Sequence, residues 1–67
     1  MNGVRKLREK SGETLNALAL RTGIEPSLLS LIERGKHPSL RNAERIAKAL
    51  KADPRELWTD YETLRKW

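Results

Sequence analysis

Glycine and proline divide this chain into five short segments, and each segment carries apolar residues at helical spacing. Gly12, Gly23 and Gly35 follow three of these segments, and Pro26 and Pro54 stand where the first turn of a helix tolerates proline. No run of β-branched residues alternates with polar residues, as a half-buried strand requires. The sequence therefore predicts an all-α fold, a compact bundle of about five short helices.

The length of the chain, 67 residues, limits it to one small core. A domain of this size buries only about 60% of the surface that its unfolded chain exposes, so its helices must pack economically. The chain has no cysteine for disulfides or thiolate zinc sites, and a single histidine cannot form a metal cluster alone. We expect one domain over residues 1–67, without a metal or a cofactor.

The first four expected helices have clear ends and inward faces. The first spans about residues 3–11, and Thr14, Pro26 and Ser39 open the next three as N-caps or first-turn residues. Arg8 is expected to point largely outward from the first helix, with its charged neighbours. The inward positions are Val4, Leu7, Leu15, Leu18, Ala19, Thr22, Leu29, Ile32, Leu40, Ala43, Ile46, Ala47 and Leu50.

The fifth helix begins at Asp53-Pro54-Arg55-Glu56, which is close to a capping box. Beyond it, Leu57, Tyr61 and Leu64 form a helical stripe that could extend to Trp67. A break near Thr59-Asp60 is equally compatible with the sequence, because Asp60 can cap a separate final turn.

Residues 15–34 have the spacing of a DNA-binding helix-turn-helix. Ala19 must be small because the next helix crosses close to it, and Gly23 supplies the positive φ of a short turn. Beyond Ala19 and Gly23, four further groups of residues occur in the order Leu7-Arg8, Ile32-Glu33-Arg34-Gly35, Pro38-Ser39-Leu40 and Ala47-x-Ala49-Leu50. Over nearly its whole length the sequence resembles the Cro/C1-type (XRE-like) helix-turn-helix family, which implies a lambda-repressor-like fold.

The resemblance also implies an ion pair between Arg8 and Glu33 that ties the first helix to the end of the third. The alternative is a pair of solvated charges, which would contribute only about 0 to 1 kcal/mol.

The net charge of the chain is +5, from 14 Lys and Arg against 9 Asp and Glu, so polyanions are natural partners. The three aromatic residues all lie in the last ten positions, where they cannot form a series of rings for stacking single-stranded bases. Together with the resemblance, this charge predicts that the partner is double-stranded DNA.

If the family geometry holds, the third helix lies in the major groove. Ser27 and Arg34 can hydrogen-bond to bases, whereas Pro26 and Leu31 can pack against thymine methyl groups. Few side chains of this helix can hydrogen-bond to bases, because apolar residues occupy positions where relatives usually carry polar ones. The expected phosphate contacts, each with a solvated surface position as its alternative, are Thr14, Asn16, Lys36, His37, Arg41 and Arg45.

Leu28 and Leu31 have three competing interpretations. They contact thymine, or they form an apolar ridge for a protein partner, or the helix is rotated and they join the core.

The C-terminal segment, residues 54–67, is a possible dimerisation segment, because aromatic residues are enriched at interfaces. A dimer would place two recognition helices about 34 Å apart. The alternative is that Leu57 and Trp58 cap the core of the monomer itself. The candidate interface residues are Leu57, Trp58, Tyr61, Leu64 and Trp67.

We therefore expect a homodimeric transcriptional regulator, a repressor of a short palindromic operator. The rival is a protein-interaction module of the same fold, antitoxin-like or accessory, that binds a partner through Leu28, Leu31 and the aromatic segment. An enzyme is not expected, because no Ser, Cys or carboxylate near His37 could complete a catalytic site with it, and no carboxylate cluster for a metal is apparent. Without a long apolar run or a signal peptide, a soluble, cytoplasmic protein is expected, with no membrane or small-molecule partner.

Overall fold

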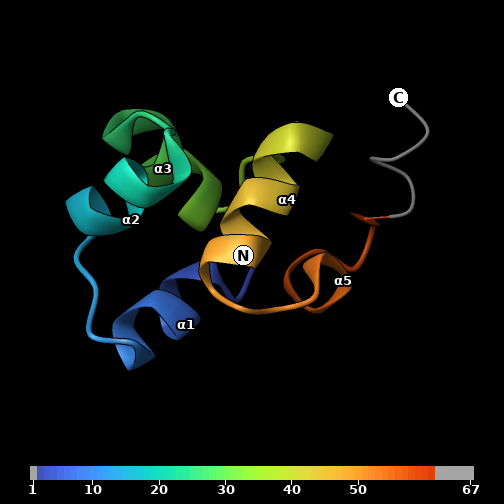
Figure 1. Ribbon diagram of the computed structural model, residues 1–67. Helices are drawn as coiled ribbons and strands as arrows, with labels where there is room; N and C mark the ends of the chain where they lie inside the picture. The colour runs from blue at the N-terminus through green and yellow to red at the C-terminus, as the bar shows by residue number, and fades with distance from the viewer. Residues whose placement is uncertain (1, 62–67) are drawn as a thin grey trace.

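A computed structural model describes residues 2–61, and this part of the chain forms five α-helices and no strand (Figure 1). The Cα radius of gyration is 10.7 Å, close to the roughly 11 Å of a compact chain of this length. The expected all-α bundle is therefore confirmed. Its helices are α1 (Val4–Lys10), α2 (Leu15–Thr22), α3 (Pro26–Glu33), α4 (Leu40–Ala49) and α5 (Pro54–Leu57).

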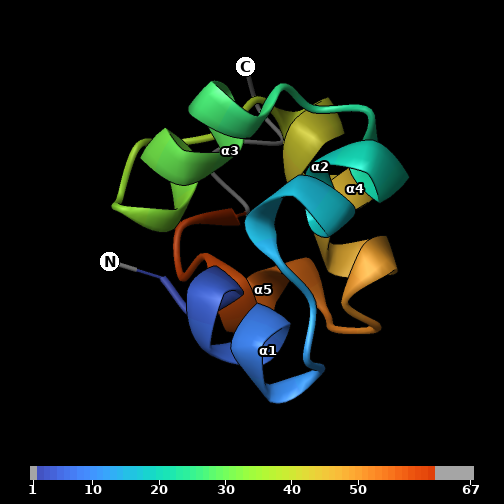
Figure 2. The ribbon, with the colours of Figure 1, turned by 90° about the vertical axis from the view of Figure 1, so that its left-hand side faces the viewer.

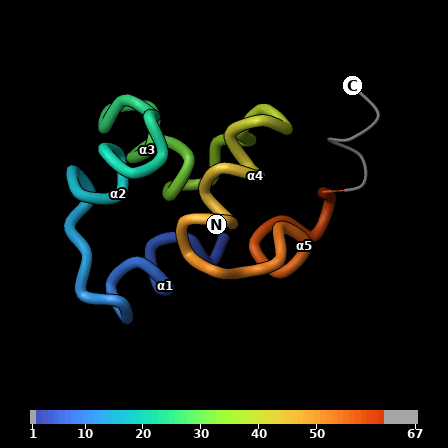
Figure 3. The backbone as a smooth tube through the Cα atoms, viewed as in Figure 1, coloured from blue at the N-terminus to red at the C-terminus, as the bar shows by residue number. Residues whose placement is uncertain are grey.

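Helix α2 packs against both α3 and α4, and α4 packs against α5. The chain rises from α1 to α2 and α3, then returns through α4 to α5 (Figures 1 and 3). After a quarter turn of the molecule, α1 and α3 again lie at opposite ends (Figure 2). The largest fully buried side chains come from four helices: Val4, Leu18, Leu29, Ile32 and Ile46.

Two helices begin with the expected hydroxyl caps. The side-chain oxygens of Thr14 and Ser39 each accept a hydrogen bond of 3.1 Å from the backbone N–H three residues later. At α5 the Asp53 carboxylate instead accepts from the backbone N–H of Arg55, at 2.9 Å. This bond is the main reason that the pKa of Asp53 lies below its ordinary value.

The fifth helix is short, so the interpretation of one long C-terminal helix is wrong. It ends at Leu57, and Trp58 has extended backbone angles of φ −128° and ψ 112°. Both side chains are buried, at 4% and 5% exposure. Burying the large Trp58 ring in the core outweighs continuing the helix by one more turn. Leu57 and Trp58 thus cap the chain's own core, which was the alternative to a dimer surface, and Leu64 and Trp67 lie outside the described residues.

Helix α4 ends in a left-handed residue that is not glycine. Lys51 has φ 54°, its N–H donates to the Lys48 carbonyl at 3.2 Å, and the Ala52 N–H donates to the Ala47 carbonyl at 2.9 Å. This pair of bonds is the Schellman motif, in which glycine is the usual left-handed residue. A side chain there costs about 1 to 2 kcal/mol.

We expect Lys51→Gly to raise the free energy of unfolding by about 0.5 to 1 kcal/mol. Glycine removes the steric cost of the left-handed conformation, and this gain exceeds the cost of the greater entropy that glycine gives the unfolded chain. Urea denaturation measures the change. The control is Lys48→Gly, inside α4, which should lower the free energy of unfolding by about 1 kcal/mol. A loss of stability in both variants would show that the left-handed residue carries no strain.

No helix in the described part of the chain has the length and apolar character needed to cross a membrane.

Candidate nucleic-acid interface

Helix α3 has one buried face and one exposed face. Leu29 and Ile32 are fully buried, whereas Ser27, Leu31 and Arg34 are exposed. Pro26 occupies the first turn of α3 and is exposed as well. The four residues expected to contact bases therefore lie on the side of α3 that the rest of the chain leaves open.

The two leucines with competing interpretations have different environments. Leu28 is half-buried and packs against the core, as the rotated-helix alternative expected. Leu31 is 42% exposed and remains available for an intermolecular contact. The apolar ridge of two leucines, on which the rival protein-interaction hypothesis depends, is thereby reduced to one.

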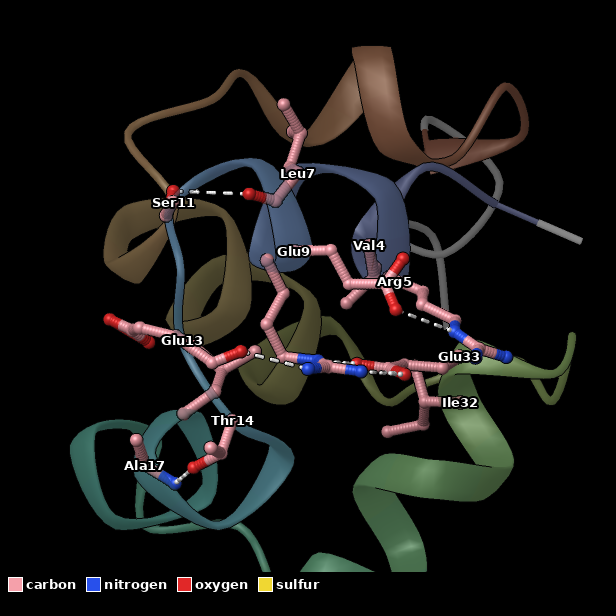
Figure 4. A network of polar contacts seen from close by, with 12 residues as sticks. Val4, Arg5, Leu7, Glu9, Ser11, Glu13, Thr14, Ala17, Ile32 and Glu33 are labelled. Atoms are coloured by element: carbon pink, nitrogen blue, oxygen red, sulfur yellow. Dashed lines mark hydrogen bonds and ion pairs between the residues drawn. The ribbon is translucent and has the colours of Figure 1, made fainter.

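The end of α3 is fixed to α1 by a bidentate ion pair (Figure 4). Arg8 Nε donates to Glu33 Oε2 at 2.6 Å, and Arg8 Nη2 donates to Glu33 Oε1 at 3.2 Å. A third nitrogen, Nη1, donates to the Glu13 carbonyl at 2.9 Å. The Arg8 and Glu33 side chains are only 11% and 6% exposed, so the alternative of two solvated charges does not describe them.

The outward orientation expected for Arg8 is therefore wrong. Helical periodicity places its Cα at the edge of the apolar stripe, but the Glu33 carboxylate draws the long side chain inward. The hydrogen bond with Glu33 is also the main reason that the pKa of Arg8 is raised.

A second tether at the same end of α3 comes from the N-terminus. Asn2 Nδ2 donates to the Ile32 carbonyl at 2.7 Å, and Asn2 Oδ1 accepts from the Val4 N–H at 3.1 Å. One amide side chain thus satisfies a backbone group at the start of α1 and another near the end of α3. Asn2 was not predicted from the sequence, although asparagine is a common capping residue and stands two positions before α1.

The turn that leads into α3 is fixed by Gly23 and Thr22. Gly23 has φ 72° and donates its N–H to the Ala19 carbonyl at 2.9 Å. The buried Thr22 hydroxyl donates to the Leu18 carbonyl at 2.9 Å and accepts from the Ile24 N–H at 3.3 Å. These bonds hold α3 at a fixed angle to α2, as groove recognition by a short helix requires.

Arg21 joins α2 to α4 and was also missed. Its guanidinium forms an ion pair with Glu13 and donates through Nη2 to the Ala49 carbonyl at 2.6 Å. Because Arg21 and Ala49 are 28 residues apart, no local sequence pattern could have revealed this contact.

The residues expected to contact phosphate are all exposed, but their side chains differ in the contacts they make. Within residues 2–61, the side chains of Lys36 and Arg41 make no hydrogen bond or ion pair. His37 Nδ1 lies 3.1 Å from Asp60 Oδ2. Arg45 extends beside the turn before α3, with Nη1 4.0 Å from the position of a Cβ at Gly23. Thr14 and Asn16 are exposed at the start of α2.

Among the described residues, no group of three His, Cys, Asp or Glu side chains could hold a metal ion.

An exposed α3 held at a fixed angle behind α2 defines a helix-turn-helix DNA-binding domain. The family Helix-turn-helix (HTH_3) matches residues 4–57, from α1 through α5, and the chain belongs to this Cro/C1-type family. The family comprises DNA-binding transcriptional regulators and not enzymes, so the expected recognition, lambda-repressor-like fold and non-enzymatic class are confirmed.

The chain is also similar to the HTH-type transcriptional regulator SlrR of Bacillus subtilis (strain 168). The two sequences are 36% identical over 63 residues, which cover 91% of this chain and 41% of SlrR. The chain thus spans about two fifths of the length of that relative. No solved structure matches the chain.

Proposed function

We propose that this chain binds duplex DNA sequence-specifically by placing α3 in the major groove. The observation that carries the proposal is the division of α3, whose buried residues fix it to the core while Ser27, Leu31 and Arg34 remain exposed. Similarity to a protein described as a transcriptional regulator supports this assignment.

The chemistry of the exposed face predicts a mixed readout. Arg34 can donate two hydrogen bonds to a guanine edge, and Ser27 can donate to or accept from any base. Leu31 and Pro26 offer apolar surface to the methyl group of thymine. The preferred site should therefore include thymine near the centre of α3 and guanine near its C-terminal end.

Phosphate contacts would supply most of the affinity. The proposed set provides exposed groups at the start of α2, after α3 and along α4, on a chain with a net charge of +5. Because each neutralised phosphate releases counterions, affinity should fall steeply with salt. The residues of this set are Thr14, Asn16, Lys36, His37, Arg41 and Arg45.

The short length of α3 supports a homodimer that binds a palindromic operator. Helix α3 has 8 residues and is about 12 Å long, so one copy contacts only part of a helical turn of DNA. Two copies about 34 Å apart would read two half-sites. We further propose that the bound dimer represses transcription by occupying its operator.

Selection of binding sites from random duplex DNA tests this function. The expected result is an enriched inverted repeat that binds at least 100-fold more tightly than a scrambled duplex. Sedimentation of the complex should give two chains per duplex, and a reporter gene downstream of the selected site should be repressed. Binding without an enriched sequence would overturn sequence-specific recognition, and one chain per duplex would overturn the dimer.

The role of Leu31 can be tested by removing single methyl groups from the selected site. Replacing the contacted thymine by uracil should weaken binding by the native chain about fourfold, the value of one buried methyl group. For Leu31→Ser, thymine and uracil should bind equally well. The control is Leu20→Ser, which changes an exposed leucine outside α3 and should retain the native preference for thymine over uracil. Titrations by fluorescence anisotropy distinguish these results.

A further inference from the structure

The most exposed large apolar side chain of the described residues lies on α2 and not on α3. Leu20 is 86% exposed, about twice the 42% of Leu31. Exposed leucines are common singly, so its surroundings decide whether it has a role.

Leu20 lies at the edge of a groove of about 660 Å³ between α2 and α4. The groove is formed by the second half of α2, the turn at Gly23, and the residues Arg45, Lys48 and Ala49 of α4. A second hollow, of about 350 Å³, continues along α4 past Leu40 and Arg41, and it shares Arg45 and Lys48 with the first. We call the two together the α2–α4 groove.

The charged rim of the α2–α4 groove is mostly positive. In residues 2–61, the side chains of Arg41, Arg45 and Lys48 make no hydrogen bond or ion pair and are exposed. Arg21 is already paired with Glu13. Three free cations therefore line the two hollows together with Leu20 in the first and Leu40 in the second, and Glu44 is the single acidic residue among the lining residues.

This combination of groups favours one kind of occupant. A second copy of the chain, with its net charge of +5, would be repelled by the cationic rim. A phosphate backbone would satisfy Arg45 and Lys48 but would leave Leu20 in contact with anionic oxygens. An amphipathic helix with acidic residues beside its apolar stripe satisfies both the cations and the leucines.

We propose that the α2–α4 groove docks an acidic amphipathic helix of a partner protein. Leu20 and Leu40 pack against its apolar stripe, and Arg45 and Lys48 pair with its carboxylates. The lining residues come from α2, the turn and α4, and none of them belongs to α3. Arg45 also belongs to the residues proposed to contact phosphate, so the partner and DNA compete for this side chain.

The test uses a displayed library of 18-residue helical peptides with randomised apolar and charged positions. Peptides are selected on the native chain, and the enriched sequences are synthesised as probes. We expect enrichment of acidic peptides with leucine or phenylalanine at i, i+3/i+4 spacing. Leu20→Ser and Lys48→Gln should each weaken binding of the best peptide at least tenfold, whereas Leu31→Ser and Lys6→Gln should not.

The same variants separate this surface from the DNA interface. Leu20→Ser and Lys48→Gln should bind the selected DNA site as the native chain does, whereas excess DNA should weaken binding of the peptide to the native chain, because both ligands use Arg45. Peptides that bind Leu20→Ser as tightly as the native chain would overturn the proposal. It would also be overturned if Lys48→Gln weakened DNA binding and lowered its salt dependence, because the groove would then face phosphates.

Discussion

Replacing Arg8 by methionine is expected to lower the free energy of unfolding by about 3 kcal/mol, the cost typical of removing one partner from a buried ion pair. The variant leaves the Glu33 carboxylate, 6% exposed, without its counter-ion, and it also removes the donor to the Glu13 carbonyl. Urea denaturation followed by circular dichroism measures the change. For a domain of this size the loss is a large share of the total stability.

An exposed ion pair on the same helix provides the matched control. Arg5 and Glu9 lie 3.4 Å apart, with side chains 60% and 56% exposed, so Arg5→Met should change stability by no more than about 0.5 kcal/mol. Adding Glu33→Leu to Arg8→Met should recover part of the loss, because no unpaired charge remains buried. If Arg8→Met proved as stable as the native chain, the pair would not contribute to the fold.

The raised pKa of Arg8 also sets how this contribution depends on pH. A group whose pKa is higher in the folded than in the unfolded chain stabilises the fold below its unfolded pKa, and the stabilisation disappears only as the pH rises through the folded pKa. Because the pKa of Arg8 is raised above its ordinary, strongly alkaline value, mainly by its hydrogen bond with Glu33, its contribution should stay constant across neutral and mildly alkaline pH. The difference in unfolding free energy between Arg8→Met and the native chain, measured from pH 7 to 10, should therefore be flat.

The largest effect on DNA binding is expected from the double variant Lys36→Gln/Arg41→Gln. Both side chains are exposed and have no partner among residues 2–61, so they are free to contact phosphates. Losing two charge-assisted contacts should weaken binding about 100-fold. It should also reduce the slope of log K against log salt by about 2. Fluorescence anisotropy at several salt concentrations gives both quantities.

A control with the same net charge separates phosphate contacts from general electrostatics. Lys6→Gln/Lys10→Gln removes two exposed charges from α1, at the end of the molecule opposite α3 (Figure 2). This variant should weaken binding only a few-fold and leave the salt slope nearly unchanged. Equal effects of the two double variants would show that Lys36 and Arg41 contribute only their long-range field.

The α3 face illustrates how far a sequence pattern reaches. The i, i+3 pair of Leu29 and Ile32 was enough to predict which side of α3 is buried, because helical periodicity fixes which residues share a face. The same periodicity could not assign Leu28, which lies at the boundary of that face. Its environment depends on how far α3 is rotated against the core.

The sequence by itself determined the five helices, the caps at Thr14, Ser39 and Asp53, and the helix-turn-helix spacing, because these depend on local backbone preferences and on residues at most one or two turns apart. Only the tertiary structure decided how deeply the Arg8–Glu33 ion pair is buried, that Trp58 ends α5 by entering the core, and that Arg21 reaches the Ala49 carbonyl. Such contacts join residues that are distant in the chain. A long or large side chain goes where a buried partner or an apolar space is available, and that place exists only after the helices have packed.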